Sequence, residues 1–137
     1  MLKVILADNQ AIFRAGAAKV LAVEDDMRIV AQAQNAEQVT MSLDRFRAAV
    51  LVISESLMPE LGKVVSDARK QKTHVVVVSD KPEQAADLIR TGAAGIVFRS
   101  VTGSALVECI RKVSKGENWV QDTAVAKEVE ESDQVGA

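Results

Sequence analysis

The sequence of 137 residues has the length of one compact domain, and its apolar (48%) and charged (26%) fractions are those of a globular protein. A formal net charge of −2 gives no general electrostatic case for nucleic acid or an anionic membrane, so we expect DNA binding only through a domain not present in this chain. Its single cysteine excludes an intramolecular disulfide and no apolar stretch reaches the ~20 residues that cross a bilayer, features that favour the cytoplasm.

Five short apolar runs alternate with amphipathic segments along the chain. The runs cover residues 4–7, 29–33, 50–53, 75–78 and 95–98. Because both faces of these Val- and Ile-rich runs are apolar, they are typical of parallel strands covered by helices on both sides. Five strand–helix units in series predict a single α/β domain with a doubly wound parallel sheet.

The segments between the runs carry apolar residues at helical spacing. The expected inward faces are Phe13, Gly16, Ala17, Val20 and Leu21; Val39, Leu43 and Phe46; Leu61, Val64, Val65 and Ala68; and Leu106, Ile110 and Val113. A fourth helix, from about 82 to 91, has a thinner apolar stripe, and we expect it to be the least firmly packed.

Capping residues mark the expected helix ends. Asn35 with Gln38, and Asp80 with Glu83, resemble capping boxes in which a side-chain oxygen accepts an unpaired backbone N–H group. Gly92 and Gly116 stand where the fourth and fifth helices should stop. Residues 122–137 differ, with five acidic side chains and little apolar periodicity. We therefore expect a domain over 1–121, followed by an acidic C-terminal extension or linker over 122–137.

The polar residues that follow the first, third, fourth and fifth predicted strands are candidates for a site. They are Asp8 and Asn9; Ser54, Glu55 and Ser56; Ser79 and Asp80; and Arg99 and Ser100. The carboxyl ends of parallel strands meet at one edge of the sheet, which is where ligands bind in open α/β folds. The sequence therefore predicts a site that combines carboxylates, a hydroxyl and a guanidinium. We interpret Asp80 as a helix cap, His74 at the opposite rim as a surface residue, and Cys109 as a small buried residue.

Four segments resemble the response-regulator receiver (CheY-like) family, in particular its NarL/LuxR-type branch. They are Val4-Ile5-Leu6-Ala7-Asp8-Asn9-Gln10, residues 53–59 with Met58-Pro59, Gly92-Ala93-Ala94-Gly95, and residues 106–119. The resemblance spans about residues 1–120 and implies a five-stranded sheet of order 2-1-3-4-5. It also implies phosphoryl transfer from a histidine kinase to an aspartate after the third strand, with bound Mg²⁺.

The residues at the family's functional positions depart from that pattern. Counted back from Met58-Pro59, the phosphoacceptor position holds Glu55. The other positions map onto Asp8, Asn9 and the Leu57 carbonyl for the metal, Ser79 for the hydroxyl, Arg99 for the lysine and Ile96 for the aromatic switch.

These departures predict a site that no longer works in the ordinary way. Glutamate moves its carboxylate one methylene further into the pocket, and Asn9 lacks the charge with which a second carboxylate would hold Mg²⁺. We therefore expect no cofactor, Mg²⁺ binding that is weak or absent, and no enzymatic activity. Since the planar guanidinium of Arg99 favours bidentate carboxylate bonds, we predict an Arg99–Glu55 ion pair with Ser79 as a third partner. The alternative is a drifted site without regulatory meaning.

The resulting expectation is an atypical receiver that regulates transcription through protein–protein interaction without ordinary aspartyl phosphorylation. One alternative retains phosphotransfer, with Glu55 as the acceptor. Another is a stand-alone scaffold that dimerises through helix four, strand five and helix five, or through helices one and five. The expected partners are a second copy of the chain and a histidine kinase or other signalling protein, with no role for a membrane.

Overall fold

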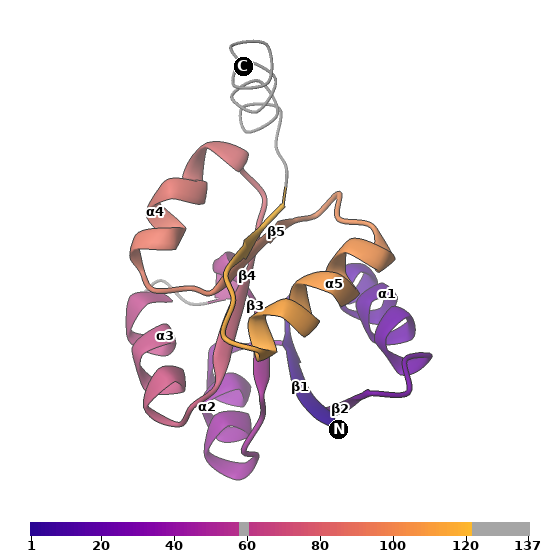
Figure 1. The fold of residues 1–137 in the computed structure, drawn as a ribbon. Helices are drawn as coiled ribbons and strands as arrows, with labels where there is room; N and C mark the ends of the chain where they lie inside the picture. Colours follow the sequence, from indigo (N-terminus) through magenta and orange to yellow (C-terminus); the bar gives the residue numbers. More distant parts are fainter. Residues whose placement is uncertain (58–60, 122–137) are drawn as a thin grey trace.

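The computed structural model describes residues 1–57 and 61–121, and these form one parallel sheet between two layers of helices (Figure 1). The strands are β1 (Leu2–Ala7), β2 (Met27–Ala33), β3 (Val50–Ser54), β4 (His74–Ser79), β5 (Gly95–Phe98) and β6 (Trp119–Val120). The helices are α1 (Ala11–Ala22), α2 (Ala36–Arg45), α3 (Leu61–Lys70), α4 (Ala85–Arg90) and α5 (Gly103–Ser114). Two 3₁₀ turns, η1 (Glu55–Leu57) and η2 (Pro82–Gln84), follow β3 and β4.

The strand order is β2-β1-β3-β4-β5-β6, with every neighbouring pair parallel. The predicted order 2-1-3-4-5 is confirmed, and β6 extends the sheet beyond β5. The backbone N–H groups of Trp119 and Gln121 donate to the carbonyls of Ala94 and Ile96 along the β5 edge. A strand of two residues carries too little periodicity to be found from the sequence.

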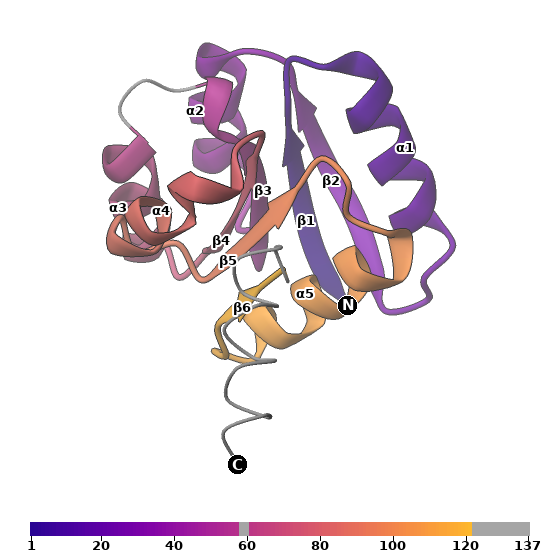
Figure 2. The same cartoon turned by 90° about the horizontal axis from the view of Figure 1, so that it is seen from above.

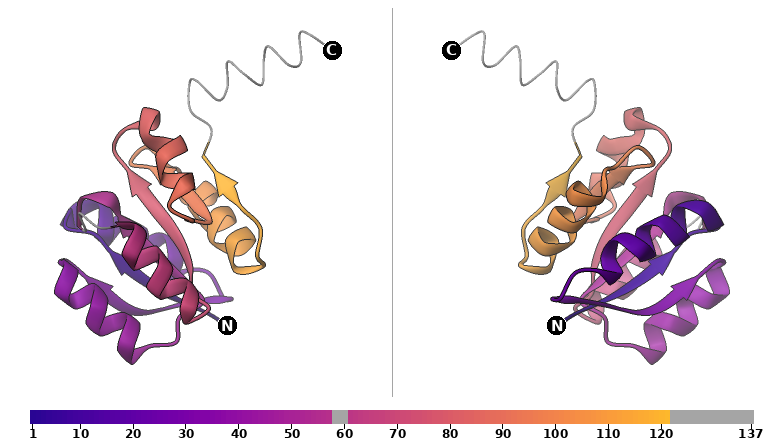
Figure 3. Two further views of the ribbon diagram at one scale, coloured as in Figure 1. Left: turned by 90° about the vertical axis from the view of Figure 1, so that its left-hand side faces the viewer. Right: turned by 90° about the vertical axis from the view of Figure 1, so that its right-hand side faces the viewer.

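Each face of the sheet has its own buried cluster. The view from above shows helices on both sides of the sheet (Figure 2). Helices α2, α3 and α4 pack on one face, and α1 and α5 pack on the other (Figure 3). Strands β3 and β5 are buried throughout, and β1 and β4 are buried beyond their first residues. Ile5, Leu51, Ile53 and Ile96 are among the largest side chains without solvent exposure. This two-sided burial explains why the strands read as continuous apolar runs.

The helix ends follow the predicted signals in part. Asn35 Oδ1 accepts the backbone N–H of Gln38, while Gln38 Oε1 reaches back to the N–H of Gln34 rather than to that of Asn35. Gly92 and Gly116 end their helices with φ of 97° and 88°, a conformation that glycine adopts without steric cost.

The fourth helix is shorter than predicted. The chain first forms η2 and then α4 over only six residues, and no side-chain cap precedes α4. The interpretation of Asp80 as a helix cap was wrong, since its carboxylate binds Arg99 instead.

The Met58-Pro59 pair and the acidic segment 122–137 lie outside the described residues. None of the helices in the described ranges combines the length and hydropathy of a membrane span.

Candidate functional site

The predicted convergence of polar residues at the carboxyl edge of the sheet is present. Asp8 follows β1, Ser54 and Glu55 lie at the end of β3, Ser79 ends β4 and Arg99 follows β5. Asp8, Ser54 and Ser79 are buried, whereas Glu55 and Arg99 are half-buried. These five side chains form two hydrogen-bonded groups, one centred on Arg99 and the other on Glu55.

In the first group, the Arg99 guanidinium binds the carboxylate of Asp8 in a bidentate manner. Its Nη1 contacts Oδ2 of Asp8, and its Nη2 donates to Oδ1 at 3.1 Å and to the Ser54 hydroxyl at 2.9 Å. The third edge of the guanidinium donates from Nε to Oδ1 of Asp80 at 2.9 Å. The Phe13 ring of α1 covers the guanidinium face, with its centroid 4.8 Å from Cζ.

The electrostatics of this group favour the charged guanidinium. Burial lowers the pKa of Arg99, but hydrogen bonds and charge–charge attraction with Asp8 and Asp80 raise it by more, so the net pKa lies above the ordinary arginine value. The Asp8 side chain is only 5% exposed, and Arg99 supplies its counter-charge. The guanidinium of Arg99, which follows β5, therefore holds a positive charge beside Asp8 at the carboxyl end of β1.

In the second group, the Glu55 carboxylate accepts hydrogen bonds from neutral donors. The Ser79 hydroxyl donates to Oε1 at 2.9 Å, and the backbone N–H of Asp80 donates to the same oxygen at 3.2 Å. The Gln84 side chain lies against both oxygens; with its amide nitrogen facing them, it donates at 3.1 and 3.0 Å. Within residues 1–57 and 61–121, no cationic side chain pairs with Glu55.

The predicted Arg99–Glu55 ion pair is therefore wrong. Glu55 begins the turn η1 directly after β3, and its side chain turns away from Arg99. The Ser54 hydroxyl lies with Arg99 on the side of α1, whereas Glu55 turns towards η2 and contacts Ser79 and Gln84. The predicted contact between Glu55 and Ser79 is present.

The residues at the metal positions do not fit a divalent ion in this arrangement. Both oxygens of Asp8 bind the guanidinium, and Oδ1 of Asn9 accepts a hydrogen bond from the Ser56 hydroxyl at 3.1 Å. The third position, Leu57, lies in η1 and is half-buried. Among the described residues, no group of three or more His, Cys, Asp or Glu side chains is arranged to hold a metal ion.

The position of the aromatic switch holds a fully buried side chain. Ile96 lies in β5 with no solvent exposure and packs in the cluster under α2, α3 and α4. An aliphatic residue lacks the polar tip with which a tyrosine can turn towards water.

Three contributors to the site were not predicted as site residues: Phe13, the Asp80 carboxylate and Gln84. Phe13 has the spacing of an ordinary core residue, which hides its contact with Arg99. Asp80 directly follows Ser79 at the end of a strand, and this position was the available signal. Gln84 lies in η2, where no pattern distinguishes it from surface residues.

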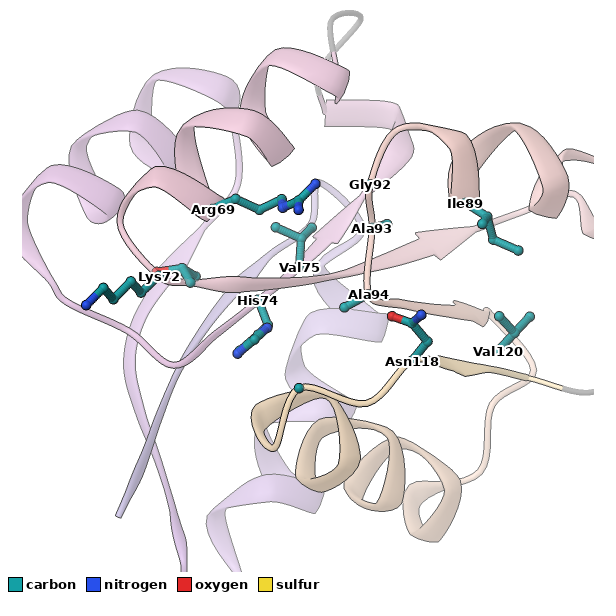
Figure 4. Close-up of a pocket in the computed structure, with 12 residues that line it drawn as sticks. Arg69, Lys72, His74, Val75, Ile89, Gly92, Ala93, Ala94, Asn118 and Val120 are labelled. Atoms are coloured by element: carbon teal, nitrogen blue, oxygen red, sulfur yellow. The ribbon is translucent and has the colours of Figure 1, made fainter.

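A pocket of about 580 Å³ lies at the opposite, amino-terminal edge of the sheet (Figure 4). Arg69, Lys72 and His74 contribute basic side chains to its lining, whereas Val75 and Ile89 are apolar. None of the residues of the two hydrogen-bonded groups lines this pocket, so its size is no argument for the chemistry of the site.

Cys109 is buried, as predicted, beneath β5. Burial, helped by the nearby charge of Glu108, raises the pKa of its thiol to about 12. Since the thiolate is the reactive form, this cysteine is inert at neutral pH.

Comparison with known proteins agrees with the fold and the sequence pattern, although no family model matches the chain. The oxygen regulatory protein NreC of Staphylococcus aureus is 27% identical over 125 residues, covering 87% of this chain and 58% of NreC. The signal receiver domain of the putative response regulator NarL from Mycobacterium tuberculosis superposes with a TM-score of 0.75 at 21% identity, covering 85% of this chain and 98% of that domain. A LuxR-family two-component response regulator from Aurantimonas has a TM-score of 0.78 at 20% identity, covering 96% of both chains.

The homologues and structural neighbours are thus NarL/LuxR-type response regulators with receiver domains. The chain has the CheY-like receiver fold of these proteins. The chain spans about 58% of the length of the curated relatives that it matches. The resemblance described above predicts the acceptor position at Glu55 and the lysine position at Arg99.

Proposed function

We propose that this receiver regulates transcription through protein–protein contacts and does so without ordinary aspartyl phosphorylation. The observation that carries the proposal is the hydrogen bond of 2.9 Å from the Ser79 hydroxyl to Glu55. In the family, the hydroxyl at this position contacts the phosphoryl oxygens. Here the side chain at the acceptor position binds the hydroxyl by itself.

Glu55 imitates a phosphorylated aspartate in part. It provides about one negative charge and two oxygens, compared with about −1.5 to −2 and three acceptor oxygens for a phosphoryl group. The backbone of Asp80 and the amide of Gln84 also bind this carboxylate, so its charge can position the loop between β4 and α4. The receiver is then held in one state, and abundance or partner binding sets its output.

The proposed partners are a second copy of the chain and another signalling protein of the cytoplasm, such as a histidine kinase. Of the two dimer faces expected from the sequence, the α4–β5–α5 face carries β6 along the β5 edge. The α1–α5 face presents Ile12, which is 91% exposed, beside the groove between α1 and the start of α5. We therefore favour the α1–α5 face for self-association, with DNA contacted by a domain outside this sequence.

The experiment that tests the proposal is incubation of the chain with acetyl phosphate and Mg²⁺, followed by intact-mass measurement. We expect no phosphoryl adduct on the native chain, while an ordinary aspartate receiver treated in parallel is modified. The second candidate function, residual phosphotransfer to Glu55, predicts a stoichiometric adduct that is lost in Glu55→Gln. That result would replace the proposal.

A further inference from the structure

The guanidinium of Arg99 lies against the Asp8 carboxylate, which is one of the groups that the resemblance assigns to the divalent ion. Four of its N–H···O contacts go to Asp8, Ser54 and Asp80, and they involve Nε, Nη1 and Nη2. Both Asp8 oxygens are bound to the guanidinium, so a divalent ion that used this carboxylate would have to compete with Arg99.

Two further residues fix the guanidinium in that place. Asp80 binds Nε, the edge of the fork that faces away from Asp8, and its own backbone N–H binds Glu55. Phe13 covers the guanidinium face from α1, where cation–π attraction holds a planar cation well. A lysine at position 99 would lose the bidentate bond and the third edge, because an ammonium is a compact charge on a flexible stem.

We propose that Arg99 is a built-in cation that replaces the divalent ion of this receiver, with Asp80 and Phe13 as its positioning residues. The inference rests on the proposed function in one respect: both assume that the family's site lies at Asp8 and Glu55. It adds that the protein's own charge, and not a bound metal, neutralises Asp8. This protein then needs no divalent ion to neutralise the Asp8 carboxylate.

The competing explanation is that the neutral amide of Asn9 alone weakens the metal site. The two explanations make opposite predictions for Asn9→Asp. If the missing charge at position 9 were decisive, this single change would restore divalent-ion binding. If Arg99 is decisive, Asn9→Asp leaves binding weak, because the guanidinium still holds both oxygens of Asp8.

The test measures binding of Mn²⁺ alone to three forms of the whole chain, from the electron paramagnetic resonance signal of free Mn²⁺. The forms are the native chain, Asn9→Asp, and the triple variant Asn9→Asp/Arg99→Lys/Asp80→Ala. We expect no saturation of the first two at about 1 mM Mn²⁺. The triple variant should bind about 10- to 100-fold more tightly, the range over which residues beside metal ligands alter affinity.

A matched control separates the site from general charge effects. Asn9→Asp/Arg90→Lys/Asp87→Ala makes the same types of change in an exposed ion pair of α4, and it should bind Mn²⁺ no better than Asn9→Asp. Phe13→Leu in the Asn9→Asp background should strengthen binding by less than the Arg99 and Asp80 changes. Circular dichroism establishes that each variant is folded. If these residues had only a structural role, the substitutions would alter stability and leave the Mn²⁺ affinity unchanged.

Three results would overturn the inference: tight Mn²⁺ binding by the native chain, full binding by Asn9→Asp alone, or no binding by a folded triple variant. Each is independent of phosphoryl transfer, because no phosphoryl donor is present. A native chain that binds Mn²⁺ but gains no phosphoryl adduct would refute the built-in cation and leave the proposed function intact. A phosphoryl adduct on Glu55 would refute the proposed function.

Discussion

Arg99→Ala is expected to lower the free energy of unfolding by about 3 kcal/mol, the lower end of the range for removing one partner of a buried ion pair. The substitution leaves Asp8, whose side chain is 5% exposed, without its counter-charge, and it also frees the carboxylate of Asp80. Because Arg99 itself is 19% exposed, water can reach the vacated space and limit the loss. Urea denaturation followed by circular dichroism measures the change.

Two comparisons identify the cause of this loss. Arg90→Ala breaks an exposed pair with Asp87 and should change stability by less than about 0.5 kcal/mol. Asp8→Asn in the Arg99→Ala background removes the unpaired charge and should recover part of the lost stability, because a buried charge costs more than a buried amide. A double variant less stable than Arg99→Ala would show that lost packing, rather than the unpaired charge, dominates.

Gly95→Ala should be the second most damaging change, with a cost of about 2 kcal/mol from overpacking. A Cβ atom at this position would lie 2.9 Å from Sγ of Cys109, 3.0 Å from Val76 and 3.1 Å from Val113. Val76 lies in β4, which pairs with β5, and Cys109 and Val113 lie in α5, which packs on the sheet. Neither element can shift easily to make room for the added methyl group. Thermal or urea unfolding of the variant measures the loss.

The chain offers matched controls for this prediction too. Gly16→Ala places its Cβ in open space on α1 and should be neutral or stabilising by up to about 1 kcal/mol, since alanine favours the helix. In a Cys109→Ala background, Gly95→Ala should cost less than in the native chain, because the closest contact is absent. Equal costs in both backgrounds would mean that Cys109 does not limit the space above β5.

The sequence was sufficient to predict the sheet because its central strands are buried on both faces. The runs at 50–53 and 75–78 carry no polar residue, and only a covered parallel strand tolerates that composition. The rim of the sheet followed from topology alone, since parallel strands bring their carboxyl ends together. For that reason Asp8, Ser79 and Arg99 could be placed near one another before their contacts were known.

The partners of Arg99 could not be predicted in the same way. Three carboxylates, those of Asp8, Glu55 and Asp80, follow three different strands, and nothing in their order along the chain says which of them Arg99 reaches. The choice depends on the face to which each side chain turns, and Glu55 turns away from α1. Strand β6 was missed for a different reason: two residues are too few to show a pattern.

The central claim is that the protein's own side chains already occupy the site, Glu55 at the Ser79 hydroxyl and Arg99 at Asp8. The most direct test adds beryllofluoride and Mg²⁺, which together mimic a phosphoryl group on a receiver carboxylate, to the ¹⁵N-labelled chain and records its amide spectrum. The positive control is the variant Glu55→Asp/Asn9→Asp/Arg99→Lys/Asp80→Ala, which restores the family's residues at positions 9, 55 and 99, removes the Asp80 carboxylate and should respond. We predict unchanged amide signals for Ser79, Asp80 and Arg99 in the native chain. New signals for these residues in the native chain, lost on Glu55→Gln, would contradict the claim.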